Sequence, residues 1–218
     1  MDGNGRWAKE RRRARLSGHR AGAKTLDAVM RYCREAGIRY LTVYAFSTEN
    51  WKRSKEEVSG LMKLLSSFIK AKGKTLVKER VSFRVIGRKT DLPPDLQREI
   101  AALEEKTAGG EFTLAVALSY GGRAEIVDAA KAWAASGAKG ELTEEEFSKF
   151  LYAPDIPDPD LIIRTSGECR TSNFLMWESA YSEWYFTDVY WPDFDRAEFD
   201  RALESYSRRE RRMGGRLK

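Results

Sequence analysis

The opening 24 residues of the chain hold its densest set of side chains that could bind phosphate. They include an acidic residue, a Gly-x-Gly turn, several arginines and the one histidine of the chain: Asp2, Gly3, Asn4, Gly5, Arg6, Trp7, Arg15 and His19. Glycine leaves backbone N–H groups accessible to an anion, and the guanidinium group of arginine matches phosphate oxygens. A carboxylate beside phosphate requires a hard cation such as Mg²⁺ between the two. The stretch therefore indicates a metal-assisted phosphate or diphosphate site.

Each of these features also has an ordinary structural interpretation. The Gly-x-Gly turn follows neither the Walker pattern nor the dinucleotide spacing, because Ala8 stands where the third glycine would be. The basic run 9–15 is typical of a solvated helix face, and His19 of a hydrogen-bonded structural histidine. Only the combination of these features favours phosphate binding.

Composition limits the classes of protein to which the chain can belong. Its 218 residues are 42% apolar and 33% charged, which suits one folded domain spanning 1–218. The net charge of +6 favours an anionic partner, such as phosphate, nucleic acid or a membrane surface. Cys33 and Cys169 have no metal-site or disulfide spacing, which fits the reducing cytoplasm. No apolar run reaches the roughly 20 residues of a membrane span, and no signal peptide opens the chain.

Helical and strand-like segments alternate along the sequence. Short runs rich in β-branched and aromatic residues predict strands over 40–46, 81–86, 112–118 and 161–163. Apolar residues at helical spacing predict helices over 21–37, 58–76, 96–106, 124–135, 143–150 and 195–212. The proline-rich segment 155–160 is typical of a surface linker. This order predicts an α/β fold with a mainly parallel central sheet flanked by helices.

Polar clusters follow the ends of the predicted strands and occupy 2–7, 47–53, 119–123 and 164–173. Because ligands bind beyond the carboxyl ends of parallel strands, we expect the clusters to converge on one pocket. Arg164 and Arg170, six residues apart, form a second candidate anion cradle. Ser54 and Glu57 are spaced as a capping box for the helix that follows.

The helix predicted over 58–76 carries an apolar stripe that includes Leu61, Leu64 and Leu65. Such a stripe is typical of a core face. It also suits a slot for an apolar ligand, and the pattern does not separate these two interpretations.

Seven motifs together resemble the cis-prenyltransferases, and among them the bacterial members that make undecaprenyl diphosphate. The motifs lie, in the order of the family, at 1–8, 18–22, 44–51, 119–123, 163–168, 170–174 and 191–194. The resemblance runs from Met1 to Gly215. It implies a homodimeric, Mg²⁺-dependent transferase with an apolar tunnel. The enzyme would extend farnesyl diphosphate, or another allylic diphosphate, with successive isopentenyl diphosphates and cis double bonds. The product would be a precursor of the cell-wall lipid carrier, and its release implies peripheral membrane contact.

The resemblance also implies roles for individual residues. The residues expected to bind the allylic substrate are Gly3, Asn4, Gly5, Arg6, Trp7, Arg15 and His19. Those expected to hold isopentenyl diphosphate are Arg164, Arg170 and Ser172. Asp2 would hold Mg²⁺, with Glu183 as the second acidic residue. A loop that closes over the substrate would bring to the reacting centre Ser47, Asn50, Trp51 and Arg53. The candidates for the tunnel wall are Val43, Ala45, Leu61, Leu64, Leu65 and Val116.

The family chemistry is consistent with these roles. Arginines, backbone N–H groups and Mg²⁺ stabilise the charge that develops on the leaving diphosphate. The second cradle orients the attacking double bond. Three acceptors for the departing proton remain open: Asp2, a group bridged by Asn50, and the diphosphate of the substrate. The catalytic residues expected from the resemblance are Asp2, Asn50 and Ser47.

The chain departs from the family pattern at three places. Relatives carry a short apolar strand just before the opening Met-Asp, whereas this sequence begins at Met1. Three explanations stay open: the sequence as given omits that strand, its start is misassigned, or the sheet lacks the strand. Cys169 occupies a position where some bacterial relatives have histidine, and no metal role is carried over to it. Arg88 stands where an aspartate often follows the Ile-Gly pair, and the sequence offers no functional interpretation of it.

Two other classes of function compete with a prenyltransferase. The basic runs 9–15 and 208–212, together with six tryptophans, could bind nucleic acid. However, these runs lie at the two ends of the chain, whereas the specific motifs lie at strand ends. A non-catalytic partner subunit is the third hypothesis. Such subunits lose the aspartate and the Gly-Asn-Gly-Arg motif, which this chain retains. We therefore expect an enzyme that does not bind nucleic acid.

Overall fold

The computed structural model describes residues 1–138 and 140–210. Their contacts divide the chain into two compact units. Unit 1 consists of Met1–Tyr32, Asp158–Thr171 and Met176–Lys218, and unit 2 of Cys33–Pro157 and Ser172–Leu175.

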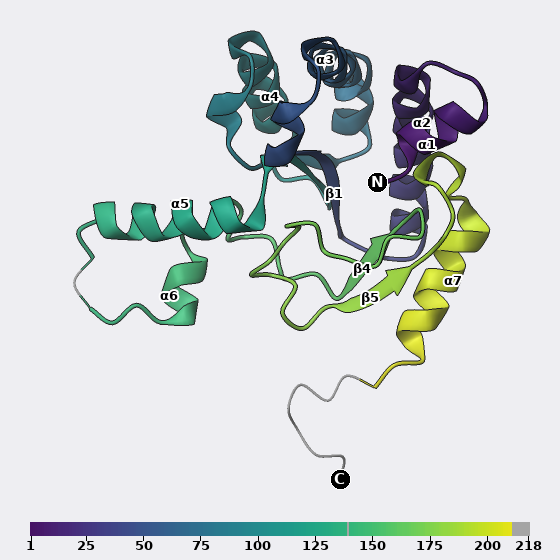
Figure 1. Cartoon of the computed structure of the whole chain (residues 1–218). Helices are drawn as coiled ribbons and strands as arrows, with labels where there is room; N and C mark the ends of the chain where they lie inside the picture. The colour runs from purple at the N-terminus through teal and green to yellow at the C-terminus, as the bar shows by residue number, and fades with distance from the viewer. Residues whose placement is uncertain (139, 211–218) are drawn as a thin grey trace. The chain divides into compact units, whose positions relative to one another are not determined.

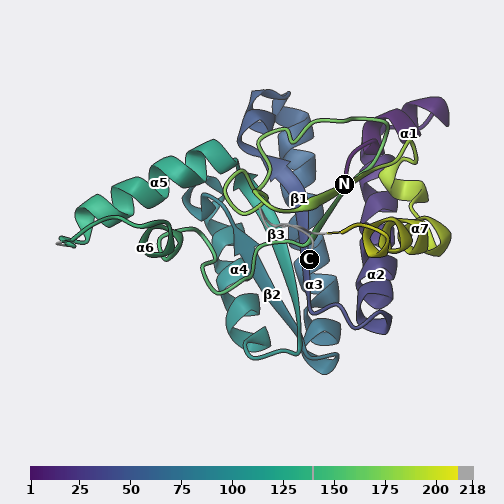
Figure 2. The ribbon, with the colours of Figure 1, turned by 90° about the horizontal axis from the view of Figure 1, so that it is seen from below.

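Unit 2 is built on a parallel sheet in which β3 (Phe112–Tyr120) lies between β1 (Tyr40–Ser47) and β2 (Val81–Ile86). Figure 2 shows the three strands side by side. Eight of the nine residues of β3 are buried, as expected for a central parallel strand covered on both faces. Because such a strand must be apolar along most of its length, its sequence alone predicted it. The three strands predicted for this part of the chain are confirmed.

Two helices of unit 2, α3 (Lys55–Lys78) and α4 (Pro94–Thr107), pack against each other (Figure 1). Both also contact β2. Helix α3 begins three residues earlier than predicted. The Glu57 N–H donates to the Ser54 hydroxyl oxygen at 3.2 Å and caps the helix. The Glu57 carboxylate instead accepts from Arg53 at 2.8 Å. Ser54 therefore acts as the predicted cap, while the Glu57 side chain stabilises Arg53.

The remaining described elements of unit 2 are two helices and two 3-10 turns. Helix α5 (Gly122–Ala135) lies beside α6 (Glu144–Ser148) (Figures 1 and 2). Two 3-10 turns follow strands of the sheet: η1 (Thr48–Lys52) comes after β1, and η2 (Lys89–Asp91) comes after β2. Both turns contact β3, and so the segments that follow the outer strands reach the central one.

Unit 1 contains a second parallel ladder, β4 (Leu161–Arg164) paired with β5 (Glu183–Phe186), and α7 (Arg196–Ser207) packs against β5. Its other elements are α1 (Asn4–Glu10), η3 (Trp191–Asp193) and most of α2 (Arg15–Glu35). The α/β class and the parallel pairing are confirmed. The described strands form two ladders, however, rather than one continuous sheet.

Three sequence predictions in unit 1 need correction. The expected glycine turn of residues 3–5 belongs to the start of helix α1, and α2 begins at Arg15 rather than at residue 21. Strand β5 was not predicted, because its sequence Glu-Trp-Tyr-Phe contains no β-branched residue, unlike the equally short β4. The last helix ends at Ser207, and residues 211 and 212 of its expected range lie outside the described residues. No described helix combines the length and apolarity needed to cross a membrane.

Arg88 has a structural role that the sequence did not reveal. Its guanidinium group donates to both carboxylate oxygens of Asp128 in α5, at 2.7 and 2.9 Å. The Tyr152 hydroxyl donates to the same carboxylate at 2.6 Å. The bidentate pair therefore ties the end of β2 to α5. The hydrogen bonds from Arg88 hold the pKa of Asp128 below its ordinary value, although partial desolvation of the carboxyl opposes this.

The stability contributed by this pair is expected to depend on pH. Because the folded-state pKa of Asp128 is lowered, its contribution is complete above the unfolded pKa of about 3.9 and is lost as the pH falls through the folded value. Arg88→Ala should lower the free energy of unfolding by about 1–2 kcal/mol at pH 7. Urea titrations at pH 7, 5 and 3.5 measure the difference from the wild type. A difference that stays constant over this range would contradict the assignment.

Candidate active site in unit 1

Asp2 is held by its backbone against the end of strand β4. The Asp2 N–H donates to the Thr165 hydroxyl oxygen at 3.0 Å, and this hydroxyl donates in turn to the Asp2 carbonyl oxygen at 2.9 Å. Thr165 is fully buried, and the Trp191 N–H donates to the same carbonyl at 3.0 Å. The backbone of Asp2 is thus fixed without help from its side chain, which leaves the carboxylate available for a ligand.

Arginines surround the Asp2 carboxylate. Arg164 donates to Oδ2 at 3.1 Å, and Arg6 lies 3.7 Å from Oδ1. Arg6 also forms an ion pair with Glu168 at 3.1 Å and donates to the Ser166 carbonyl at 3.1 Å. Arg170 donates to Glu168 and, through its carbonyl oxygen, accepts from Arg164. Within unit 1, therefore, the predicted clusters 2–7 and 164–171 come together as one charged network.

This environment keeps Asp2 ionised. Desolvation by burial favours the neutral acid, but hydrogen bonds from the Gly3 N–H at 2.7 Å and from Arg164 outweigh it. The pKa of Asp2 consequently lies below its ordinary value. An ionised carboxylate is a weak proton acceptor, and its oxygens are ligands of the kind that Mg²⁺ prefers once an anionic diphosphate offsets the charge of the two arginines.

Helices α1 and α2 approach closely at two predicted residues of α1, Asn4 and Gly5. A Cβ added at Gly18 would lie 1.9 Å from the Asn4 carbonyl oxygen, and so only glycine fits there. A Cβ at Gly5 would lie 3.0 Å from Nε of Arg15, which places that side chain against Gly5. His19 follows Gly18 in α2 and is half-buried. Gly18 is therefore the residue that allows the two helices to meet at Asn4.

Trp7 is a structural member of the network. Its indole N–H donates to Asp193 at 2.7 Å, and Arg11 pairs with the same carboxylate at 3.0 Å. The guanidinium groups of Arg11 and Arg13 lie over the Trp7 ring, 4.5 and 5.8 Å from its centroid. Part of the basic run 9–15 is thus engaged in packing Trp7, which weakens the case for a nucleic-acid surface.

The Asp2 carboxylate is a ligand of the kind that Mg²⁺ prefers. Glu183 of the same chain, however, does not lie beside Asp2. No group of three His, Cys, Asp or Glu side chains gathers anywhere in residues 1–138 and 140–210. Mg²⁺ commonly binds through one or two carboxylates, substrate phosphates and water, so Asp2 alone is a sufficient protein anchor. Glu183 pairs with Leu161 at the opposite end of the ladder from Arg164, about 10 Å away along the strand. Its carboxylate is engaged by Arg209.

Polar residues of unit 2 form a cluster of their own. The Asn50 side chain accepts from the Ser47 N–H at 3.1 Å and fixes the turn after β1. Asn173 donates to Glu49 at 3.1 Å and accepts from the Arg123 N–H at 2.8 Å, so it joins this turn to the start of α5. The predicted clusters 47–53 and 119–123 therefore meet within unit 2. Ser172 belongs to the same unit.

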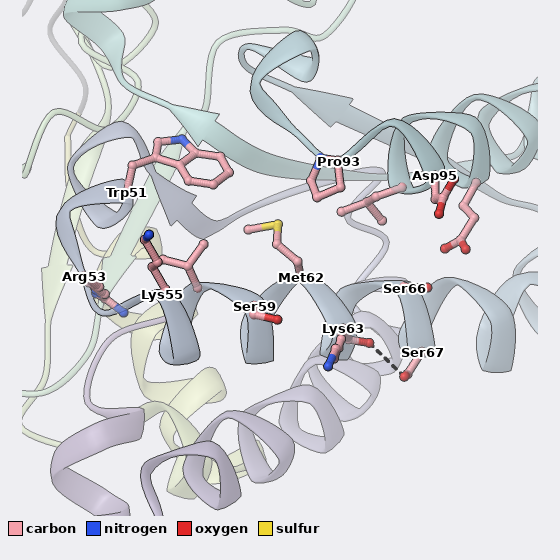
Figure 3. Close-up of a pocket in the computed structure, with 13 residues that line it drawn as sticks. Trp51, Arg53, Lys55, Ser59, Met62, Lys63, Ser66, Ser67, Pro93 and Asp95 are labelled. Carbon is pink, nitrogen blue, oxygen red and sulfur yellow. Dashed lines mark hydrogen bonds between the residues drawn. The ribbon is translucent and has the colours of Figure 1, made fainter.

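Unit 2 also contains a groove of about 840 Å³ between α3 and α4. Figure 3 shows Trp51 at one end of it and Met62 opposite Pro93 across it. Its α3 wall includes Val58 and Met62, and none of the six predicted tunnel residues lines it. Val43 and Val116 are buried in the sheet. Three leucines of the adjacent face of α3 are only half-buried, namely Leu61, Leu64 and Leu65, and Ala45 is exposed.

Sequence reasoning missed several residues that complete these clusters. Thr165, Ser166 and Glu168 lie within the quoted motif 163–168, and Asp193 within 191–194, but none received a role. Asn173 and Glu49 were likewise quoted without one. The motifs themselves were a usable signal, because each missed residue lies inside one of them. Partners this distant in sequence, such as Asp2 and Thr165, have no local pattern that pairs them.

Comparison with known proteins identifies the family of the chain. The family model described as "Putative undecaprenyl diphosphate synthase" matches residues 1–214. The chain belongs to this prenyltransferase family. The isoprenyl transferase of Fusobacterium nucleatum is 58% identical over 216 residues, covering 99% of this chain and 93% of that protein. The isoprenyl transferase of Bacillus subtilis is 48% identical over 221 residues, covering 99% and 85%.

Comparison with a solved structure supports the same family, because the two folds are similar. The crystal structure of lavandulyl diphosphate synthase from Lavandula x intermedia, in complex with dimethylallyl diphosphate, matches with a TM-score of 0.92. Sequence identity is 35%, and the match covers 97% of this prenyltransferase and 94% of that chain. The resemblance drawn from the seven motifs is thereby confirmed, and a nucleic-acid-binding function is not favoured.

Proposed function

We propose that this prenyltransferase extends an allylic diphosphate such as farnesyl diphosphate by repeated condensation with isopentenyl diphosphate. Each step would form a cis double bond, and the product would be a long polyprenyl diphosphate, the precursor of a cell-wall lipid carrier. The observation that carries this proposal is the network in which Asp2 is fixed at the end of β4 between Arg6 and Arg164. The relative from Lavandula was solved with an allylic diphosphate, which supports the same class of substrate here.

The arginines of unit 1 suit the loss of diphosphate. In the reaction the allylic C–O bond breaks, and diphosphate leaves with the bonding electrons. Arg6 and Arg164 are held against carboxylates before substrate arrives, so their positions need little rearrangement when charge develops on the leaving oxygens. A diphosphate carries more negative charge than the carboxylates and would take over their hydrogen bonds. Arg170, next to Glu168, would hold the isopentenyl diphosphate with Arg164.

Asp2 would hold Mg²⁺ together with the oxygens of the allylic diphosphate. Bound there, the ion would neutralise part of the charge on the leaving group. The Asp2 carboxylate is ionised and is held by the Gly3 N–H. These properties suit a ligand of Mg²⁺ better than an acceptor of the departing proton. The double bond of isopentenyl diphosphate attacks the allylic carbon, and a proton then leaves the new chain. We therefore favour the departing diphosphate as its acceptor.

The prenyl chain would lie on the incompletely buried apolar residues of unit 2. Leu61, Leu64 and Leu65 form a stripe on α3 that the fold leaves half-buried, and such surfaces commonly receive ligands. Each methylene that it covers would contribute about 0.8 kcal/mol. Ser47, Asn50, Trp51 and Arg53 stay predicted contacts of the reacting group, and Ser172 a predicted contact of isopentenyl diphosphate.

The decisive test is prenyl transfer itself. The purified protein is incubated with farnesyl diphosphate and labelled isopentenyl diphosphate, with Mg²⁺ or with excess chelator, and the products are separated by chain length. Labelled long-chain products that require Mg²⁺ are the expected result. Absence of chain extension at any Mg²⁺ concentration would refute the proposal. Extension that persists in chelator would refute the metal role alone.

We also propose that the enzyme is a homodimer, as the family resemblance implies. Unit 1 exposes an apolar surface that includes Tyr181 and Phe186, and Trp184 stacks on Phe186 with ring centroids 5.7 Å apart. Phe186→Asp should shift the protein from dimer toward monomer in sedimentation velocity, because a charge there would be buried in the interface. Val77→Asp, at an exposed position on α3, is the matched control. A wild-type protein that sediments as a 24.9 kDa monomer would contradict the proposal.

A further inference from the structure

Three side chains from separate segments of unit 2 form a hydrogen-bonded chain that ends on Trp51. The Trp51 indole N–H donates to the Ser119 hydroxyl oxygen at 2.8 Å. The Ser119 hydroxyl donates to Oδ2 of Asp91 at 2.7 Å. Trp51 lies in η1, Ser119 near the end of β3 and Asp91 at the end of η2. The two turns that follow the outer strands are therefore linked through the central strand.

The order of donors and acceptors in this chain is fixed by chemistry. An indole nitrogen only donates, and an ionised carboxylate only accepts. The Ser119 hydroxyl must therefore accept from Trp51 and donate to Asp91. Without the Asp91 carboxylate, the Ser119 O–H bond has no fixed direction. The lone pairs of its oxygen then no longer point at the indole N–H.

The backbone at Ser119 is shaped for this contact. Ser119 is fully buried and has a φ of 44°, in the left-handed region that a non-glycine residue rarely adopts. Its carbonyl oxygen accepts from the Arg88 N–H at 3.2 Å, which holds the start of η2 against the end of β3. Strained residues persist only where their surroundings require them, and they gather at functional sites.

We propose that Asp91 is a positioning residue that fixes the orientation of the Trp51 ring through Ser119. The inference rests on the proposed function, in which Trp51 contacts the reacting prenyl group. Besides this hydrogen bond, Trp51 has an edge-to-face contact with Phe46, with ring centroids 4.9 Å apart. The contact with Phe46 limits the position of the Trp51 ring but does not set its rotation. The hydrogen bond to Ser119 fixes that rotation.

The first test reads the ring directly and does not depend on activity. The protein is labelled with ¹⁵N-tryptophan, and Trp51→Phe identifies the Trp51 indole signal among those of the six tryptophans. Asp91→Ala should move this signal and speed its exchange with solvent, while the other indole signals stay in place. Asp91→Asn keeps an acceptor oxygen and should produce a smaller shift. Asp95→Asn removes an exposed carboxylate from the adjacent helix and is the matched control.

The second test compares kcat and KM for the allylic substrate. Asp91→Ala should lower kcat about tenfold with little change in KM, because orientation is lost while the diphosphate contacts remain. Asp91→Asn should recover most of this loss. A Trp51 signal that does not respond to Asp91→Ala would overturn the relay. A shifted signal with unchanged kcat would overturn its role in positioning. If the wild type transfers no prenyl group, the proposed function fails, while the spectra still decide whether the relay exists.

Discussion

Replacing Asp2 with alanine should lower turnover by at least about a hundredfold while the protein stays folded. Removing one preorganised group that stabilises developing charge typically costs this much. Here the same carboxylate also balances Arg164, whose side chain is only 14% exposed, and is the proposed anchor for Mg²⁺. The fold should survive, because Asp2 is held by backbone hydrogen bonds to Thr165 that the substitution leaves intact. Steady-state prenyl transfer and thermal unfolding measure the two effects.

Two further variants test whether the loss of turnover is specific to the charge of Asp2. Asp2→Asn keeps an oxygen that accepts from the Gly3 N–H but removes the charge, and so it should be nearly as inactive as Asp2→Ala. Asp200→Asn removes an exposed carboxylate that pairs with Arg196 on α7, and it should leave turnover unchanged. If Asp2→Ala retained turnover within a few fold of the wild type, Asp2 would have no part in charge stabilisation.

Replacing Gly18 with alanine should be the most damaging single-methyl change in unit 1. The added Cβ would lie 1.9 Å from the Asn4 carbonyl oxygen and 2.8 Å from its carbonyl carbon. These are backbone atoms of α1, so the clash can be relieved only by moving the helix that carries Arg6. Overpacking of this kind costs about 3 kcal/mol. For a chain of this length, that corresponds to a fall in Tm of about 6–12 °C.

A second helix glycine supplies the control. At Gly73 in α3 a Cβ would meet only the side chain of Leu103, at 3.4 Å, which is an ordinary contact. Gly73→Ala should therefore raise the free energy of unfolding by about 0.5–1 kcal/mol, the usual gain from alanine in a helix interior. Gly18→Ala should also lower prenyl transfer more than tenfold, whereas Gly73→Ala should not. Equal Tm values for the two variants would exclude the close approach of α1 and α2.

The sheet of unit 2 and its flanking helices were predictable because their signals are local. Strand β3 is a nearly continuous apolar run, and β1 and β2 are rich in β-branched and aromatic residues. Helix α3 shows both its apolar periodicity and its Ser54 cap in the sequence. Strand β5 was missed because its four residues include no β-branched side chain, whereas the equally short β4 holds two isoleucines. The opening stretch was predicted as a glycine turn, yet α1 begins there at Asn4 and contacts α2 at Gly18, a contact that the sequence does not reveal.

The sequence by itself predicted the kind of chemistry, since an aspartate, glycines, arginines and a histidine in the quoted motifs indicate a metal-assisted diphosphate site. It also determined the family. Only the tertiary structure decided which of these residues meet. It joined Asp2 to Thr165 and Arg164, separated Glu183 from Asp2 along the β4–β5 ladder, and connected Trp51 to Asp91. The physical reason is that residue type and periodicity are local properties, whereas a hydrogen bond between residues 163 positions apart exists only after the chain has folded.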